Sequence, residues 1–384
     1  MKILVKTAFG LESILAKEIE ELGGKKVEIL KRGIFCEGGD ELIYRINYES
    51  RTALRVLKFL AEFEVRNENE LYRGVSSMDW DEIFDSTDTF AIDSIVHSEY
   101  FTHSKYVALK SKDAIVDQFR KKHNHRPSID TTSPNFRIMV HIRDTTCGLF
   151  LDSSGYSLHK RGYRFRSTEA PISECLAAGM LKLAGWDGNG TFLDPMCGSG
   201  TFLIEAAMMA LHIPAGKYRT AYAFQQWKDY KADVFQKIKK QANDRSLQKK
   251  EGLRILGSDK SRVVIQSTQE NIKQAGLENV ITLEPKPIQR LKNESPEGLI
   301  VTNPPYDKRL KDDDIEELYS NLGDVFKKQF TGWTAWIISS NIAALKKVGL
   351  STSKKITLYN GADECKFQRY DMYAGSKKQK TRSN

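Results

Sequence analysis

Between residues 190 and 340 the sequence alternates short apolar runs with amphipathic segments of helical spacing. The apolar runs are GTFLDP, LRILGSD, VITLEP, GLIVTNPP and TAWIIS, and the segments between them include TFLIEAAMMALHI and SRVVIQSTQENIKQAG. Strands that are separated by helices pair in parallel, because the helix carries the chain back to the same end of the sheet. The pattern therefore predicts an α/β fold with a doubly wound, Rossmann-like sheet in this half of the chain.

The N-terminal half predicts two smaller α/β modules. Residues 1–65 follow the order strand, helix, strand, helix, strand, and residues 66–155 form a second mixed module whose helix ends in basic residues. Residues 212–250 are a polar, lysine-rich insertion, and KITLYNGADECKFQRYDMY predicts a closing hairpin. The basic residues 376–384 are expected to form a disordered tail.

Composition narrows the class of protein. The formal net charge of +9 favours a polyanionic partner such as nucleic acid. Five scattered cysteines without a CxxC pair argue against a disulfide framework and a structural zinc site. No run of about 18 apolar residues is present, and the N-terminus turns polar too early for a secretory signal. We therefore expect a cytoplasmic protein with no membrane partner and no metal.

The first candidate site is FLDPMCGSGTFLIEAAMMA, residues 192–210. A strand ends at Asp194, Gly198 and Gly200 allow a tight turn, and a helix follows, which is where an open α/β sheet binds its ligand. Leu203 stands where a dinucleotide-binding fingerprint has its third glycine, which disfavours a dehydrogenase. The alternative is an ordinary glycine-rich turn without a ligand.

A second strand ends at Asp259 in LRILGSDKS. A carboxylate at this position can accept hydrogen bonds from both ribose hydroxyls of a nucleoside cofactor. The alternative is that Asp259 or Ser261 caps the following helix.

The fourth strand runs into Asn303-Pro304-Pro305-Tyr306. An exocyclic amine is a poor nucleophile because its lone pair is delocalised into the ring. Two fixed hydrogen-bond acceptors on its two hydrogens would favour a lone pair localised on the nitrogen as the bond to carbon forms. The Asn303 side-chain oxygen and the Pro304 carbonyl could be these acceptors, and Tyr306 could stack on the base. The alternative is a rigid strand end with a buried tyrosine.

Taken in order, DPMCGSGT, GSD and NPPY resemble the class I S-adenosylmethionine-dependent methyltransferases that act on exocyclic amines. LHKRGYRFRSTEAPISECLAAGMLKLAGW, KDAIVDQFR, RPSID and GADECKFQRYDMY extend the resemblance to methyltransferases with a THUMP domain, in particular the 23S rRNA guanine-N2 methyltransferases. The resemblance implies a ferredoxin-like unit over 1–65, a THUMP domain over 66–155 and a methyltransferase domain over 156–375. It covers only the first half of a longer bifunctional form, so one methyl transfer activity is expected.

The resemblance also implies roles for individual residues. The S-adenosylmethionine site would consist of Asp194, Pro195, Cys197, Gly198, Ser199, Gly200, Thr201 and Asp259, and the target-base site of Asn303, Pro304, Pro305 and Tyr306. Pro287 and Ile288 stand where such enzymes usually have an acid or amide near the adenine ring, so Gln289 is the expected substitute.

Basic residues interleaved with aromatic ones suggest where RNA binds. HKRGYRFR contains Tyr163 and Phe165, and it could grip phosphates and stack bases. The predicted phosphate contacts are Lys160, Arg161, Arg164 and Arg166, with Lys308 and Arg309 beside the NPPY motif. The alternative is a solvated linker whose aromatic residues pack inward.

Three functions remain open from the sequence. The first is S-adenosylmethionine-dependent methylation of guanine N2 in 23S rRNA, and the second is adenine-N6 methylation of DNA or RNA, because the same residues suit either amine. The third is a non-catalytic RNA-binding assembly factor, which the intact motif set disfavours. Carbon-5 methylation is also disfavoured, because Cys197 lies in the cofactor turn and no cysteine stands near the end of the fourth or fifth predicted strand.

Overall fold

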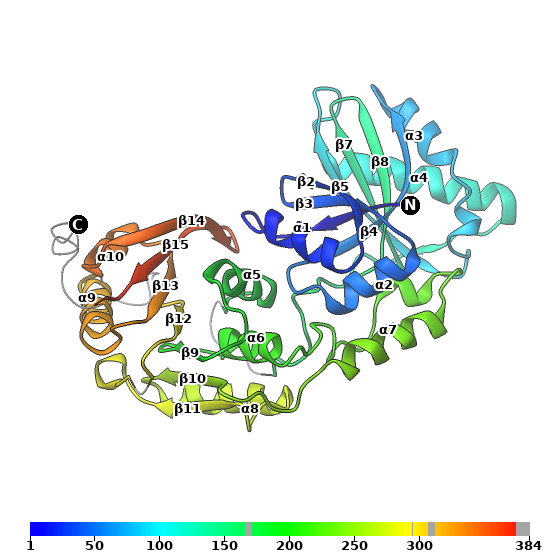
Figure 1. The fold of residues 1–384 in the computed structure, drawn as a ribbon. Coiled ribbons are helices and arrows are strands. Elements are labelled where there is room, and N and C mark those ends of the chain that lie inside the picture. Colours follow the sequence, from blue (N-terminus) through cyan, green and yellow to red (C-terminus); the bar gives the residue numbers. More distant parts are fainter. Residues whose placement is uncertain (166–170, 294, 306–311, 374–384) are drawn as a thin grey trace. The chain divides into compact units, whose positions relative to one another are not determined.

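The computed structural model describes residues 1–165, 171–293, 295–305 and 312–373. The chain divides into two compact units, and each is assembled from separate pieces of the sequence (Figure 1). The first unit comprises Met1–Lys6, Ala16–Leu158 and Arg219–Lys240. The second comprises Thr7–Leu15, His159–Tyr218 and the described residues from Gln241 onward.

The first unit contains one eight-stranded sheet in the order β2-β3-β1-β4-β8-β7-β5-β6. Its elements are β1 (Lys2–Lys6), α1 (Glu12–Glu21), β2 (Lys25–Leu30), β3 (Gly33–Glu37), α2 (Asp40–Glu49), β4 (Arg55–Glu64), α3 (Glu68–Ser76), η1 (Trp80–Glu82), β5 (Thr89–His97), α4 (Ser104–His123), β6 (Ser128–Ile129), β7 (Phe136–Arg143) and β8 (Thr146–Asp152). The first turn of α1, up to Leu15, is counted with the second unit. The two predicted N-terminal modules share this sheet. Their junction is β4, which pairs antiparallel with β1 on one side and with β8 on the other.

One expectation for this unit needs correction. The single strand predicted between the two helices of residues 1–65 is the hairpin of β2 and β3, and Arg32 takes a left-handed φ of 60° in its turn. The polar insertion is also more structured than its composition indicates, because it contains η2 (Ala223–Gln226) and α7 (Ala232–Asp244). Phe224 and Phe235 are buried and contact the ring of Tyr44 on α2, so Arg219–Lys240 packs as part of the first unit.

The second unit contains a seven-stranded sheet in the order β11-β10-β9-β12-β13-β15-β14. Its elements are α5 (Glu174–Ala184), β9 (Thr191–Asp194), α6 (Thr201–Ala210), β10 (Arg254–Asp259), α8 (Arg262–Gln274), β11 (Ile281–Pro285), η3 (Ile288–Arg290), β12 (Leu299–Thr302), α9 (Asp312–Gln329), β13 (Thr334–Ser339), α10 (Ile342–Lys347), β14 (Thr352–Asn360) and β15 (Asp363–Asp371). The strands from β11 to β13 are parallel, and β14 and β15 form an antiparallel hairpin at the edge. The predicted Rossmann-like sheet is confirmed.

The strand order of this sheet fixes where a ligand can bind. From β9 the chain moves outward to β10 and β11, and it then returns to β12 on the other side of β9. Such a reversal leaves a crevice at the carboxyl ends of the two central strands. Two apolar cores cover the sheet: one includes residues of α5, α6 and α8, and the other includes residues of α9 and α10.

One short N-terminal segment belongs to the second unit. Leu11 is fully buried in the core that contains α5 and α6, and Phe9 contacts the ring of Tyr359 edge-on with centroids 5.4 Å apart. A Cβ added to Gly179 on α5 would lie 2.4 Å from Leu11 Cδ1, so the glycine is needed for this close approach. Among the described helices, none is long and apolar enough to cross a membrane.

Candidate methyl-transfer site

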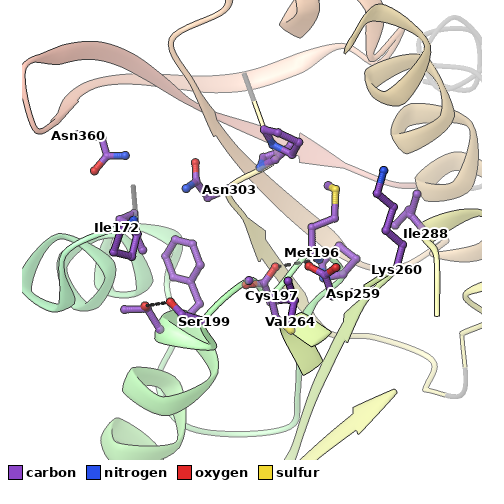
Figure 2. A pocket seen from close by; sticks show the side chains of 18 of the residues that line it. Ile172, Met196, Cys197, Ser199, Asp259, Lys260, Val264, Ile288, Asn303 and Asn360 are labelled. Atoms are coloured by element: carbon purple, nitrogen blue, oxygen red, sulfur yellow. Dashed lines mark hydrogen bonds between the residues drawn. The ribbon is translucent and has the colours of Figure 1, made fainter. Parts of the chain in front are cut away.

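A cavity of about 800 Å³ lies at the carboxyl ends of β9, β10 and β12 in the second unit. This volume lies within the range of ligand pockets. Figure 2 shows Asn303 near its centre, with Ile172 and Asn360 toward one end and Asp259, Lys260 and Ile288 toward the other. The predicted residues that border the cavity are Asp194, Pro195, Cys197, Gly198, Ser199, Thr201, Asp259, Gln289, Asn303, Pro304 and Pro305.

The turn after β9 depends on two glycines. Gly198 and Gly200 both have left-handed backbone angles, with φ of 50° and 79°. The Gly200 N–H donates to the Cys197 carbonyl over 2.7 Å, and the Cys197 N–H donates to the Ser258 carbonyl over 2.9 Å. A Cβ on Gly200 would lie 2.6 Å from the Thr268 methyl group. The turn is therefore closed on itself, tied to the end of β10, and intolerant of a side chain at Gly200.

Two buried polar residues of α8 support this turn from below. The Thr268 hydroxyl donates to the Gly198 carbonyl. The Asn271 amide donates to the Ser199 carbonyl over 3.0 Å, and its oxygen accepts the Phe165 N–H over 2.9 Å. Our sequence reasoning missed both residues, although two polar side chains on the inward face of an amphipathic helix are a usable signal, because buried polar groups need partners.

The carboxylate of Asp194 ends β9 and is 1% exposed. Its Oδ1 accepts the Met196 N–H over 3.2 Å. Burial, with a smaller contribution from the negative charge of Asp259, raises the pKa of Asp194 to about 7. This carboxyl group therefore changes charge near neutral pH, and a positively charged ligand group beside it would favour its ionised form.

Asp259 ends β10 at the same edge of the sheet. Its Oδ1 accepts the Ser261 N–H over 2.9 Å, while the Ser261 side chain caps α8 by accepting the Val264 N–H. Burial raises the pKa of Asp259 as well. Asp259 thus orders the start of the helix and also borders the cavity, so the two sequence interpretations are compatible.

Asn303 follows β12 directly. Its Oδ1 is buried and has no hydrogen-bond partner among the described residues, although the side chain borders the cavity. A buried acceptor without a donor is costly, so a ligand N–H that reached this oxygen would remove that cost. Pro304 is buried and Pro305 exposed beside it. Tyr306 lies outside the described residues.

The cavity wall near Asp259 includes apolar side chains. Pro287 and Ile288 border it together with Gln289, and Ile288 is 4% exposed while Gln289 is exposed. An aromatic ring could pack against the first two residues and meet the amide of the third, and only the contact with Gln289 was expected from the sequence.

The structure contradicts the predicted phosphate contact of Arg161. Its side chain is 1% exposed, and its Nε lies 3.4 Å from the buried Glu205 carboxylate. The Tyr163 hydroxyl donates to the same Glu205 oxygen over 3.0 Å. This guanidinium pairs with a buried acid of α6, so it is not available to RNA phosphates.

Arg164 also has an internal role that the prediction did not foresee. Its side chain is 16% exposed and pairs with Glu174 over 3.1 Å. It also donates to the Ile172 carbonyl and to the Thr201 hydroxyl, each over 3.0 Å. These contacts connect the start of α5 with the start of α6, so Arg164 braces the cavity wall instead of presenting its charge to a phosphate.

Only part of the predicted RNA-contacting set remains on the surface. Lys160 is exposed, and the neighbouring Phe165 is 70% exposed. Arg166, Lys308 and Arg309 lie outside the described residues.

Sequence reasoning did not place the tip of the β14–β15 hairpin at the site. Asn360, Gly361, Ala362 and Asp363 all border the cavity. The Asn-Gly dipeptide between two apolar strands indicates a hairpin. This dipeptide predicts the turn, but it does not indicate which ligand the turn would face.

Comparisons with known proteins agree with this architecture. Residues 2–57 match the RlmL ferredoxin-like domain, residues 65–152 the THUMP domain, and residues 161–369 the RMKL-like methyltransferase domain. The chain is 38% identical to "Putative RNA methyltransferase slr0064" of Synechocystis sp. over 95% of both chains. It is 36% identical to "Ribosomal RNA large subunit methyltransferase K/L" of Syntrophotalea carbinolica over 97% of this chain, which spans about half (54%) of that relative.

Solved structures are similar over nearly the whole chain. The crystal structure of SMU.472 complexed with SAH has a TM-score of 0.86 and 28% identity, covering 98% of this chain and 99% of that one. A structure described as a predicted N6-adenine-specific DNA methylase from Listeria monocytogenes has a TM-score of 0.85 and 26% identity, covering 97% and 96%. Since the family models, the relatives and the fold agree, the chain belongs to the THUMP-containing, RMKL-like RNA methyltransferases and uses S-adenosylmethionine as its cofactor.

Proposed function

We propose that this protein methylates the exocyclic N2 amine of a guanine in 23S ribosomal RNA. The observation that carries the proposal is the buried Asn303 Oδ1, which has no partner among the described residues and belongs to a side chain in the cavity wall. An amine N–H of the target base would supply the missing donor. Support for ribosomal RNA as the substrate comes from the name of the Syntrophotalea relative.

The amine nitrogen must become a better nucleophile, because its lone pair is delocalised into the ring. With one amine hydrogen bonded to Asn303 Oδ1 and the other to the Pro304 carbonyl, the lone pair is localised on the nitrogen and points out of the plane of the ring. When bound, the cofactor would supply an electrophilic methyl group on a sulfonium, and it would leave as the neutral thioether S-adenosylhomocysteine. Asn303 and Pro304 would hold the amine of the base in position for this transfer, and the proton that N2 loses would pass to solvent. Because the leaving group is already activated, the chain contributes mainly positioning and electrostatics.

On the cofactor side we assign three roles. Asp259 accepts hydrogen bonds from the ribose hydroxyls, Pro287 and Ile288 pack on the adenine ring, and the Asp194 carboxylate faces the positively charged methionine end. The glycine turn lets the main chain approach the cofactor. Residues 1–65 and 66–155 would capture RNA, and residues 156–375 would catalyse methyl transfer.

A second candidate is adenine-N6 methylation. Asn303 and Pro304 suit that amine equally well, and the similar Listeria structure carries an adenine-specific description. We favour guanine because the motifs along the whole chain resemble those of the 23S rRNA guanine-N2 methyltransferases, and because the relative named for ribosomal RNA matches 97% of this chain over 54% of its own length.

The test combines tritiated S-adenosylmethionine with unmodified ribosomal RNA, DNA and the purified protein, followed by nucleoside mass spectrometry. We expect label in N2-methylguanosine, and label only in N6-methyladenine would refute the guanine assignment. Asn303→Ala should lower the methyl transfer rate by about 100-fold or more while cofactor affinity changes less than about twofold. The exposed Asn279→Ala is the matched control. Unchanged methylation by Asn303→Ala would refute the acceptor role.

A further inference from the structure

The β14–β15 hairpin presents an amide and a carboxylate side by side at the cavity. Asn360 and Asp363 are the last paired residues of the hairpin, and the turn between them has only two residues. Gly361 takes a φ of 65° there, which a two-residue hairpin turn requires of its first central residue. Directly opposed residues of an antiparallel pair project from the same face, with Cβ atoms about 5 Å apart. The two polar groups are thus presented together.

Both residues border the cavity that Asn303 borders. Figure 2 shows the Asn360 side chain directed toward Asn303. Asn303 carries the proposed amine acceptor, so a base held there would place its neighbouring edge toward the hairpin tip.

The base of the hairpin is firmly packed. Cys365 and Phe367 of β15 are fully buried, and the Phe367 ring stacks on Trp336 of β13 with centroids 4.5 Å apart. On the outer strand, Tyr359 contacts Phe9, and a Cβ on Gly10 would lie 2.9 Å from the Thr357 carbonyl oxygen. A tip supported in this way can hold hydrogen-bonding groups in fixed positions.

We infer that Asn360 and Asp363 read the Watson–Crick edge of the target guanine, an inference that rests on the proposed function. Guanine presents an O6 acceptor and an N1–H donor next to its N2 amine. The Asn360 amide N–H can donate to O6, and the Asp363 carboxylate can accept from N1–H. Adenine has an unprotonated N1 beside its amine, which would face the carboxylate with two acceptors opposed. The pair therefore selects guanine over adenine.

The experiment uses the full chain and a 23S rRNA fragment around the methylated guanosine, which is first located by nuclease-fragment mass spectrometry. The fragment is made with guanosine or with 2-aminopurine ribonucleoside at that position. 2-Aminopurine keeps the N2 amine but lacks O6 and the N1 hydrogen. Single-turnover methylation rates are measured for both RNAs, and cofactor affinity is measured by calorimetry for every variant.

Wild-type protein should methylate guanosine about tenfold or more faster than 2-aminopurine. Asn360→Ala should lower the methylation rate of the guanosine RNA about tenfold. It should leave the rate of the 2-aminopurine RNA within about twofold of the wild-type rate, since 2-aminopurine has no O6 to accept a hydrogen bond. Asp363→Asn should lower the methylation rate of the guanosine RNA by a similar factor. It should raise the rate of the 2-aminopurine RNA, because the new amide can donate a hydrogen bond to N1. The control is Glu364→Gln, the adjacent exposed residue that pairs with Lys366, and it should keep both rates.

Two results are decisive against the inference. If the wild type yields N2-methylguanosine but both variants keep the wild-type ratio of the two rates, the base-reading role is wrong while the proposed function stands. If the wild-type product is N6-methyladenine, the proposed function fails and the inference fails with it. Cofactor affinity within about twofold of wild type shows that a variant is folded, so a changed ratio reports recognition of the base.

Discussion

The Asn271 side chain donates to the Ser199 carbonyl over 3.0 Å and accepts the Phe165 N–H over 2.9 Å. One amide on α8 therefore holds both the glycine turn after β9 and the segment that leads toward α5. Asn271 is 1% exposed, so solvent cannot replace these bonds.

Asn271→Leu should weaken cofactor binding and lower the free energy of unfolding by about 1–3 kcal/mol, because two buried main-chain groups lose their partners. Calorimetric titration with S-adenosylhomocysteine and urea unfolding measure the two effects. The exposed Gln274→Ala on the same helix should change stability by less than about 0.5 kcal/mol. Equal effects of the two substitutions would contradict the supporting role of Asn271.

The Asp194 carboxyl group should make stability depend on pH. Burial raises its pKa from 3.8 to about 7 in the folded state. Its contribution to stability is therefore fully present below about pH 4 and is lost as the pH rises through about 7. We expect wild-type protein to lose stability relative to Asp194→Asn between about pH 4 and about pH 7, by at most about 1.4 kcal/mol per pH unit, and to level off above that range.

Unfolding of both proteins, measured by urea titration at several pH values without cofactor, tests this prediction. The exposed Asp324→Asn on α9 provides the control, and its stability curve should run parallel to that of the wild type. A parallel curve for Asp194→Asn would show that the buried carboxyl group does not titrate in this range.

Arg161 and Lys160 should behave oppositely although they are adjacent. Arg161→Met leaves the buried Glu205 without its guanidinium and should cost about 3–5 kcal/mol of stability. Lys160→Ala should leave stability nearly unchanged but reduce the salt dependence of RNA binding by about one phosphate contact. Urea unfolding and filter binding at several salt concentrations measure these effects. A stable Arg161→Met variant with a lowered salt slope would restore the original prediction for Arg161.

Leu11→Ala should destabilise the second unit by about 2–5 kcal/mol, since Leu11 is fully buried in the core that contains α5 and α6. Hydrogen exchange of α5 and α6 amides measures this effect locally. Leu109→Ala is the control, because Leu109 is 47% exposed on α4. Unchanged protection of α5 and α6 in Leu11→Ala would mean that the N-terminal segment does not stabilise the second unit.

Local signals in the sequence predicted several of the residues that line the cavity. The strand ends at Asp194, Asp259 and Asn303 were readable because each follows an apolar run and precedes a turn or helix. Parallel strands bring their carboxyl ends to one edge, so the three residues had to share a crevice. The side chains around them were not readable in the same way. Asn360 and Asp363 flank a turn that the sequence predicts, but the sequence does not show which way that turn faces. The pairing of β15 with β13 decides this.

The sequence by itself determined the strand and helix alternation, the glycine turn and the order of the three motifs, because these depend on residues close together in the chain. Only the tertiary structure decided which unit the segments 7–15 and 219–240 join, because a few buried side chains such as Leu11 and Phe235 outweigh the polar residues around them. The tertiary structure likewise decided which basic side chains of the HKRGYRFR segment are buried. Arg161 and Arg164 are drawn inward by Glu205 and Glu174, since a buried acid needs a partner that no local pattern reveals.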